Sequence, residues 1–287
     1  MLFQEQVRKV KQAAPKLAAT TNEQRNAALT AVREALLQHQ AEIFEANKQD
    51  LAQAEADGVS GPVRKRLKFD EGKLRDVTAG ISDLTKMEDP LFQTQFAREL
   101  DEGLVLKRVT CPIGVIGVIF EARPDALVQI SALCIKSGNC VILKGGREAL
   151  RSNKKLFDII HEAIIDAGLP ADSMMQLEAR SEINELLECH ESVDLLIPRG
   201  SNAFVQYIMN HTKIPVMGHA DGICHIYVDK DADLAKAVPI IVDAKTQYVS
   251  ACNTVETLLV HEAIKDQLLP MLKEALDAKK VELRGTK

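Results

Sequence analysis

The chain shows a regular alternation of short apolar segments with helical segments, which begins near residue 104 and continues past residue 200. The segment 113–120 is almost wholly apolar, as expected for a strand that is buried on both faces. This alternation predicts an α/β fold with a parallel sheet and helices on both faces. The expected elements after it are helix 125–136, strand 140–143, helix 152–167, strand 174–177, a helix from 181, strand 193–198 and a helix from 201.

The two ends of the chain differ from this central part. Up to about residue 90 the apolar spacing is helical, and Thr21 with Gln24 has the pattern of a capping box at a helix start. The C-terminal residues predict a strand from 223, a helix capped by Asp231, strand 255–260 and helix 262–278. We therefore expect a helical layer with an α/β domain over 1–222, and an incomplete α/β domain over 223–287.

The composition favours small-molecule chemistry over nucleic-acid or membrane binding. With 36 basic and 41 acidic side chains the formal net charge is −5, which gives no electrostatic attraction to nucleic acid or to an anionic membrane. No apolar run approaches the roughly 20 residues that span a bilayer, and the N-terminus lacks a signal-peptide pattern, so we expect a cytoplasmic protein. The six cysteines and seven histidines are scattered, which predicts reduced thiols and no bound metal.

No G-x-G-x-x-G pattern follows a predicted strand, so a cofactor would have to be bound by other residues. Lys144, Gly145 and Arg147 come directly after strand 140–143, where ligands bind in open α/β sheets. Lys144 could bind a ribose and Arg147 a 2′-phosphate through charge-assisted hydrogen bonds. The alternative is a solvated basic turn without a specific partner.

Two further turns follow predicted strands. Gly200 and Ser201 stand at a helix start, whose exposed N–H groups can hold a phosphate, although Ser201 is also an ordinary helix cap. Arg123 is expected at the carboxyl end of an apolar strand, which is a ligand-facing position. The alternative for Arg123 is an ion pair with Glu121 or Asp125 at an exposed turn.

Cys252 lies between a polar loop and an apolar strand, whereas Cys134 and Cys140 lie inside apolar runs. A loop is the better place for a reactive, partly exposed thiolate. The alternative for any single cysteine is a small buried apolar side chain, and local context alone does not overturn it.

Four segments in order along the chain resemble the gamma-glutamyl phosphate reductase branch of the aldehyde dehydrogenase superfamily: 112–124, 141–149, 196–201 and 252–261. The resemblance covers essentially the whole chain. It implies an aldehyde-dehydrogenase-like fold, with a Rossmann-like NADP-binding domain over 1–222 and a partial catalytic domain over 223–287. It also implies an enzyme of proline biosynthesis that uses NADPH to reduce L-glutamyl 5-phosphate to L-glutamate 5-semialdehyde and phosphate.

The same resemblance assigns roles to individual residues. It makes Cys252 the thiolate that forms a thioester with the substrate, and Arg123 a donor to the developing oxyanion. Asn253, His219 and Asp221 are expected to contact substrate, and the alternative for the last two is a loop histidine and a turn-forming aspartate. The general-base glutamate of aldehyde-oxidising relatives is absent from the stretch 216–222, which favours a reductase.

Members of the resembled family extend beyond the position of Lys287, so we expect a C-terminally truncated chain. For a full-length chain the resemblance implies a homo-oligomer, with the strand pair in 104–120 contributing to the interface, and functional coupling to glutamate 5-kinase. The alternative is an inactive module that only binds nucleotide or a partner chain. The preference for NADPH over NADH rests on Lys144 and Arg147 alone.

Overall fold

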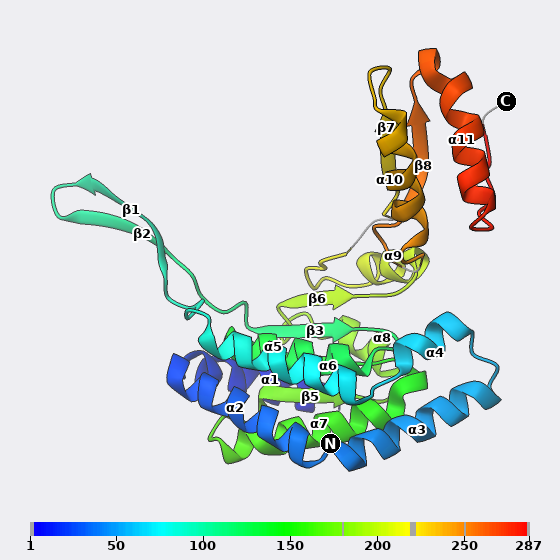
Figure 1. Ribbon diagram of the computed structural model, residues 1–287. Helices are drawn as coiled ribbons and strands as arrows, with labels where there is room; N and C mark the ends of the chain where they lie inside the picture. Colours follow the sequence, from blue (N-terminus) through cyan, green and yellow to red (C-terminus); the bar gives the residue numbers. More distant parts are fainter. Residues whose placement is uncertain (1–2, 180, 219–221, 250, 286–287) are drawn as a thin grey trace. The chain divides into compact units, whose positions relative to one another are not determined.

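The computed structural model describes residues 3–179, 181–218, 222–249 and 251–285 (Figure 1). The chain divides into two compact units, residues 1–219 (unit 1) and residues 220–287 (unit 2). Within the described ranges, no helix combines the length and the apolar character that crossing a bilayer requires.

The central sheet of unit 1 is parallel, which confirms the predicted α/β fold. Every residue of its two central strands is buried, as their apolar sequences require. The chain adds two strands to one side of the first strand and then returns to add the last strand on its other side, which creates a switch point in strand order. The strands lie in the order β5 (Met174–Leu177), β4 (Cys140–Lys144), β3 (Val115–Ile119) and β6 (Leu195–Pro198).

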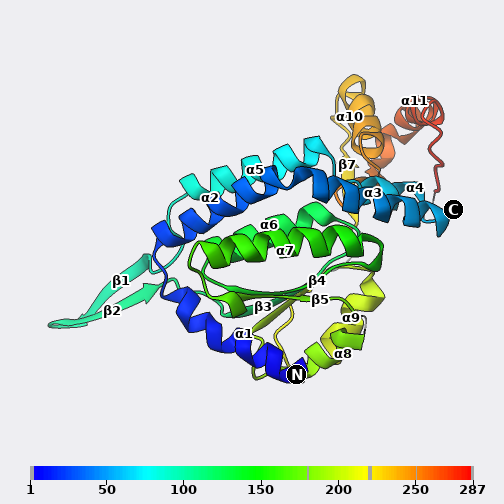
Figure 2. The ribbon, with the colours of Figure 1, turned by 90° about the horizontal axis from the view of Figure 1, so that it is seen from below.

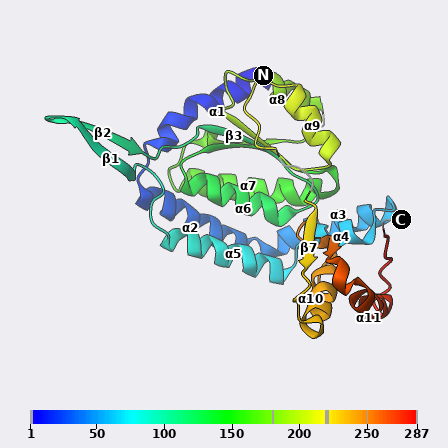
Figure 3. The same ribbon diagram turned by 90° about the horizontal axis from the view of Figure 1, so that it is seen from above.

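Helices cover both faces of this sheet (Figures 2 and 3). One face carries α1 (Phe3–Ala18), α8 (Ser181–Glu188) and α9 (Asn202–Asn210). The other face carries α6 (Pro124–Lys136) and α7 (Leu150–Asp166). An outer layer packs on these two helices and contains α2 (Asn22–Gln38) and α5 (Glu71–Lys86), with α3 (Gln40–Ala56) and α4 (Gly61–Leu67) continuing it.

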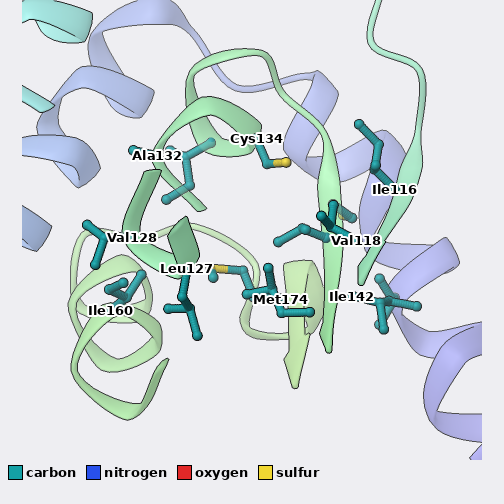
Figure 4. Packing of buried hydrophobic residues seen from close by; sticks show 14 of the residues in the cluster. Ile116, Val118, Leu127, Val128, Ala132, Cys134, Ile142, Ile160 and Met174 are labelled. Atoms are coloured by element: carbon teal, nitrogen blue, oxygen red, sulfur yellow. The ribbon is translucent and has the colours of Figure 1, made fainter. Parts of the chain in front are cut away.

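The helices that the sequence predicts before residue 90 are present, and those after α1 form this outer layer. Its capping box is present, since the Thr21 side chain accepts a hydrogen bond from the Gln24 N–H and the Gln24 side chain accepts one from the Thr21 N–H. Buried apolar side chains from the sheet and from the helices form one cluster (Figure 4). Ile142 of β4, Leu127 of α6 and Ile160 of α7 are all members of it.

An antiparallel hairpin stands away from this sheet and consists of β1 (Thr94–Asp101) and β2 (Leu104–Val109) (Figure 1). Both strands are exposed along their whole length. The predicted strands 104–109 and 113–120 are both present, but they do not pair with each other: β2 pairs with β1, and β3 lies inside the parallel sheet. The sequence does not predict β1, since a strand that buries neither face has no alternation of apolar and polar residues to reveal it.

Unit 2 contains a two-stranded parallel sheet and a small apolar core. Asp233, not the expected Asp231, caps its first helix, because the Asp233 carboxylate accepts a hydrogen bond from the Ala235 N–H. The elements are β7 (Cys224–Val228), α10 (Leu234–Thr246), β8 (Val255–Val260), the 3₁₀ helix η3 (Glu262–Ile264) and α11 (Lys265–Asp277).

Candidate active site

The carboxyl ends of the strands of unit 1 bring together the turns that the sequence indicates. Ile119 at the end of β3 pairs in register with Lys144 of β4 and with Pro198 of β6. The Arg199 N–H donates a hydrogen bond to the Ile119 carbonyl at 2.7 Å, which joins the start of one turn to the end of the neighbouring strand. The three turns after β3, β4 and β6 therefore leave the sheet at one edge, and two of them flank its switch point.

Arg123 lies at the N-cap position of α6, and 53% of its side chain is exposed. Its Nη2 donates to Oδ2 of Asp125 at 3.1 Å, and Nζ of Lys73 on α5 donates to the same oxygen at 3.0 Å. The ion pair that the sequence leaves open as an alternative is thus present with Asp125. The aspartate is buried rather than at an exposed turn, so the pair has a different environment from the one expected.

The Asp125 carboxylate is charged despite its burial. Burial by itself raises the pKa of this carboxyl, but the hydrogen bonds and positive charges of Arg123 and Lys73 outweigh it and hold the pKa below its ordinary value. Buried carboxylates are tolerated where they are paired in this way. The cluster of Asp125, Arg123 and Lys73 has a formal charge of +1, and a further carboxylate, Glu121, lies two residues before Arg123.

Lys144 is buried, so a solvated turn is the wrong interpretation for this residue. Its Nζ donates to the carbonyl of Gly145 at 2.7 Å, and burial lowers the pKa of the ammonium group. A Cβ atom at Gly145 would lie 2.1 Å from Nδ2 of Asn153, so a larger residue there would require the buried Asn153 side chain to move. Arg147 is exposed at the start of the 3₁₀ helix η1 (Arg147–Ala149).

The turn after β6 has the capping geometry that the sequence allows. Ser201 precedes α9, and its Oγ accepts a hydrogen bond from the Phe204 N–H at 3.3 Å. A Cβ atom at Gly200 would lie 2.9 Å from the Phe204 ring and 3.3 Å from Oε1 of Glu121. The Glu121 side chain thus lies against the Gly200 turn, and a larger residue at Gly200 would require the Phe204 ring to shift and Glu121 to move slightly.

Cys252 is exposed in the loop between α10 and β8 of unit 2, so a buried core cysteine is the wrong interpretation. Hydrogen bonds shape this loop: Oγ1 of Thr254 donates to the Tyr248 carbonyl at 2.7 Å, and Nζ of Lys245 donates to the Val255 carbonyl at 2.9 Å. Among the described residues, none accepts a hydrogen bond from the Cys252 N–H. A thiol and a backbone donor are therefore both available at this position.

The other expected substrate contacts are only partly described. Asn253 is exposed beside Cys252. His219 and Asp221 lie outside the described residues. No group of three or more His, Cys, Asp and Glu side chains that could hold a metal ion occurs in the described part of the chain.

Sequence reasoning missed the contributions of Lys73 and Asn153. Lys73 is separated from Asp125 by 52 positions, and it looks like an ordinary surface lysine of an amphipathic helix. Asn153 is 1% exposed, and its Oδ1 has no hydrogen-bond partner among the described residues. A buried amide with an unpaired oxygen next to a ligand-facing turn indicates a missing donor, and no sequence signal reveals it.

The thiols are expected to differ in reactivity in the native chain. Burial raises the pKa of Cys134 and that of Cys140 to about 12, so both remain protonated near neutral pH. Iodoacetamide at about pH 8 should modify the exposed Cys111 and Cys252 first, since it attacks accessible thiolates. Peptide mass spectrometry at successive times measures each site, and modification of Cys134 at the rate of Cys252 would contradict the burial.

Comparison with known proteins gives a consistent result. A sequence model of the Aldehyde dehydrogenase family matches residues 3–285. The Gamma-glutamyl phosphate reductase of Pelotomaculum thermopropionicum is 55% identical over 285 residues, which are 99% of this chain and 66% of that protein. This chain thus spans slightly less than two thirds of the length of that relative.

Solved structures agree with the sequence comparison. The crystal structure of a Gamma-glutamyl phosphate reductase from Thermotoga maritima superposes with a TM-score of 0.94 at 36% identity, covering 99% of this chain and 69% of that one. A propionaldehyde dehydrogenase from Rhodopseudomonas palustris shares the fold, with a TM-score of 0.64 at 19% identity over 95% of this chain and 57% of that one. This chain belongs to the aldehyde dehydrogenase family, in the branch of the gamma-glutamyl phosphate reductases.

Proposed function

We propose that the chain catalyses the NADPH-dependent reduction of L-glutamyl 5-phosphate to L-glutamate 5-semialdehyde and phosphate, a step of proline biosynthesis. The observation that carries the proposal is the exposed Cys252 thiol in a shaped loop, beside a backbone N–H that no described residue engages. The names of its similar relatives support the choice of substrate.

Cys252 acts as the nucleophile in this proposal. Its thiolate bonds to the acyl carbon, the carbon–oxygen bond to phosphate breaks, and phosphate leaves with the electron pair, so that a thioester remains. NADPH supplies the hydride that reduces this thioester. Cleavage of the carbon–sulfur bond then releases the aldehyde, and the sulfur leaves with the electron pair as the Cys252 thiolate. The Cys252 N–H donates a hydrogen bond to the negative oxygen that develops on the acyl carbon. Arg123 supplies positive charge and N–H donors for the anionic substrate.

The turn after β4 fits the adenosine end of such a cofactor. Gly145 and Gly146 leave the backbone accessible at the carboxyl edge of the sheet, and the exposed Arg147 can meet a 2′-phosphate. Lys144 would turn its ammonium from the Gly145 carbonyl to a ribose hydroxyl. The unpaired Oδ1 of Asn153 supports a ligand or water donor at this place.

The remaining assignments extend this proposal. Gly200 and Ser201 would face the cofactor phosphates from the start of α9. Asn253, His219 and Asp221 would contact the substrate. The enzyme would work in the cytoplasm as a homo-oligomer in functional coupling with glutamate 5-kinase, and the exposed apolar side chains Leu104, Val105 and Leu106 of β2 support such an oligomer.

The reverse reaction tests the proposal directly. The chain is incubated with L-glutamate 5-semialdehyde, NADP⁺ and inorganic phosphate, and NADPH formation is followed by absorbance. Formation that depends on phosphate is the expected result, because phosphate must displace sulfur from the thioester to complete the reverse cycle. NADPH formation at the same rate without phosphate would identify an aldehyde-oxidising enzyme instead.

Arg147→Gln is expected to raise the KM for NADPH about tenfold and to leave the KM for NADH unchanged, because a charge-assisted hydrogen bond to the 2′-phosphate is lost. Steady-state kinetics with both cofactors measure the two values. Arg151→Gln is the matched control, since Arg151 is a nearby arginine that pairs with Asp50. Equal losses with NADPH and NADH would remove Arg147 from the 2′-phosphate site.

A second candidate function is binding of nucleotide without turnover. Parallel sheets normally have both faces covered. In the two-stranded parallel sheet of unit 2, however, Tyr227 and Leu259 are about half exposed. Incomplete covering of the unit that carries Cys252 favours a chain that binds nucleotide but does not turn over substrate. Titration with NADPH beside the assay separates the two functions. Saturable binding with no turnover in either direction would support this second function.

A further inference from the structure

We propose that Asp125 is a positioning residue that orients Arg123 toward the phosphoryl group of the substrate, and that Lys73 holds Asp125 in place. This inference rests on the proposed function and deepens it, because it names two residues outside the expected site that would govern recognition of the anionic group.

The geometry joins three elements of unit 1 through one oxygen atom. Oδ2 of Asp125 accepts hydrogen bonds from Nη2 of Arg123 at 3.1 Å and from Nζ of Lys73 at 3.0 Å. Lys73 is itself placed by the start of α5, where the Asp70 side chain accepts a hydrogen bond from the Lys73 N–H. A chain of contacts thus runs from the outer helical layer to the carboxyl end of β3.

The three side chains differ in exposure: Asp125 is buried, whereas Lys73 and Arg123 are partly exposed to solvent. The Asp125 side chain is 3% exposed, whereas that of Lys73 is 39% exposed and that of Arg123 is 53% exposed. A guanidinium group has five N–H donors in a rigid plane, and only Nη2 is engaged by Asp125. Arg123 is therefore fixed at one corner, and the rest of its donor array remains accessible to an anion.

The charges around Arg123 favour an anionic ligand. Asp125 contributes one negative charge, and Arg123 with Lys73 contributes two positive charges. The other nearby carboxylate is Glu121, and it lies against the turn at Gly200 and forms no ion pair with Arg123 in the described structure. Planar guanidinium groups with fixed orientation bind phosphate by paired hydrogen bonds, which a freely rotating arginine does less well.

A purely structural role for Asp125 makes a different prediction. An acidic residue in the first turn of a helix stabilises the helix dipole wherever its partner lies. The hydrogen bonds of the Asp125 carboxylate go to side chains on both sides of it and to no backbone N–H of α6 among the described residues. The pairing therefore serves the orientation of Arg123 rather than the capping of the helix.

Whether Asp125→Asn raises or lowers the KM for phosphate shows whether Asp125 orients Arg123 or acts only through its negative charge. Asp125→Asn removes a negative charge near Arg123, which by charge alone would strengthen phosphate binding. If Asp125 orients Arg123, the same change weakens it, and the KM for inorganic phosphate in the reverse reaction should rise about tenfold with little change in the KM for NADP⁺. A lower KM for phosphate would overturn the proposal.

Two controls isolate the effect. Asp194→Asn alters a more exposed aspartate at the amino end of the same sheet, which pairs with Lys11 and accepts a hydrogen bond from the Val115 N–H, so it should lower the melting temperature without changing the KM for phosphate. In an Arg123→Gln background, Asp125→Asn should have no further effect on this KM. An undiminished effect in that background would show that Asp125 does not act through Arg123.

Two further measurements test the proposal if a variant folds poorly or if the chain shows no turnover. Lys73→Met releases Asp125 from the outer side and should also raise the KM for phosphate, by a smaller factor. If the chain shows no turnover, the proposed function fails. The orientation of Arg123 by Asp125 is then tested by itself, by comparing melting temperatures in inorganic phosphate and in chloride at equal ionic strength. Phosphate should raise the melting temperature of the unmodified chain more than that of Asp125→Asn, and equal shifts would refute the inference.

Discussion

Replacement of Cys252 by alanine is expected to abolish phosphate-dependent NADPH formation, with a loss on the order of 10⁴-fold or more, because no other group would take the acyl chain. The thiol is exposed, and among the described residues none accepts a hydrogen bond from its side chain, so the substitution should leave the fold intact. Initial rates with saturating substrates measure the loss. Circular dichroism confirms that the variant is folded.

The control for this prediction is Cys111→Ser, which alters an exposed thiol in unit 1 and should leave the rate unchanged. A chain with Cys252→Ser should retain far less activity than the unmodified chain, since a hydroxyl is a weaker nucleophile than a thiolate at neutral pH. Turnover that survives Cys252→Ala would show that another residue carries the chemistry.

Replacement of Ile142 by alanine is expected to lower the free energy of unfolding by about 2–5 kcal/mol. Ile142 is fully buried in β4, the strand that lies between β3 and β5, and it belongs to the main apolar cluster (Figure 4). Removing its outer carbons forfeits transfer free energy and leaves a cavity, because neighbours on both sides of a central strand cannot collapse fully. Urea denaturation followed by circular dichroism measures the change.

The comparison for this prediction is Leu133→Ala on α6, where 54% of the leucine is exposed. That substitution should change the free energy of unfolding by no more than about 0.5 kcal/mol, as is usual for surface sites. A loss at Ile142 as small as that at Leu133 would mean that the strand packs more loosely than the structure indicates.

The parallel sheet could be predicted because the apolar sequences of its central strands indicate strands that are buried on both faces. The apolar run 113–120 and the short strand from Cys140 have no polar face, and only a position between neighbours suits such segments. The hairpin strand β1 could not be predicted, since both of its faces are exposed and its sequence alternates in no regular way. Its partner β2 was predicted with the correct bounds, but without β1 the hairpin itself was missed.

The positions of the candidate site residues could also be predicted from the sequence, but their environments could not. Arg123, Lys144 and Ser201 were expected at strand ends because the order of elements places the turns at one edge of the sheet. Their environments were not predictable: Lys144 is buried where a solvated turn was an alternative, and Arg123 pairs with a buried carboxylate. Burial depends on which helices cover the turn, and these helices come from distant parts of the chain.

By itself, the sequence determined the class of fold, the order of its strands and helices apart from β1, and the positions from which functional side chains leave the sheet. Local patterns suffice for these features, because apolar periodicity and turn residues act over a few neighbouring positions. Only the tertiary structure decided that Lys73, 52 positions away, holds Asp125 against Arg123, and that Asn153 packs on Gly145. Contacts of this kind depend on helix packing across layers, and no local pattern encodes them.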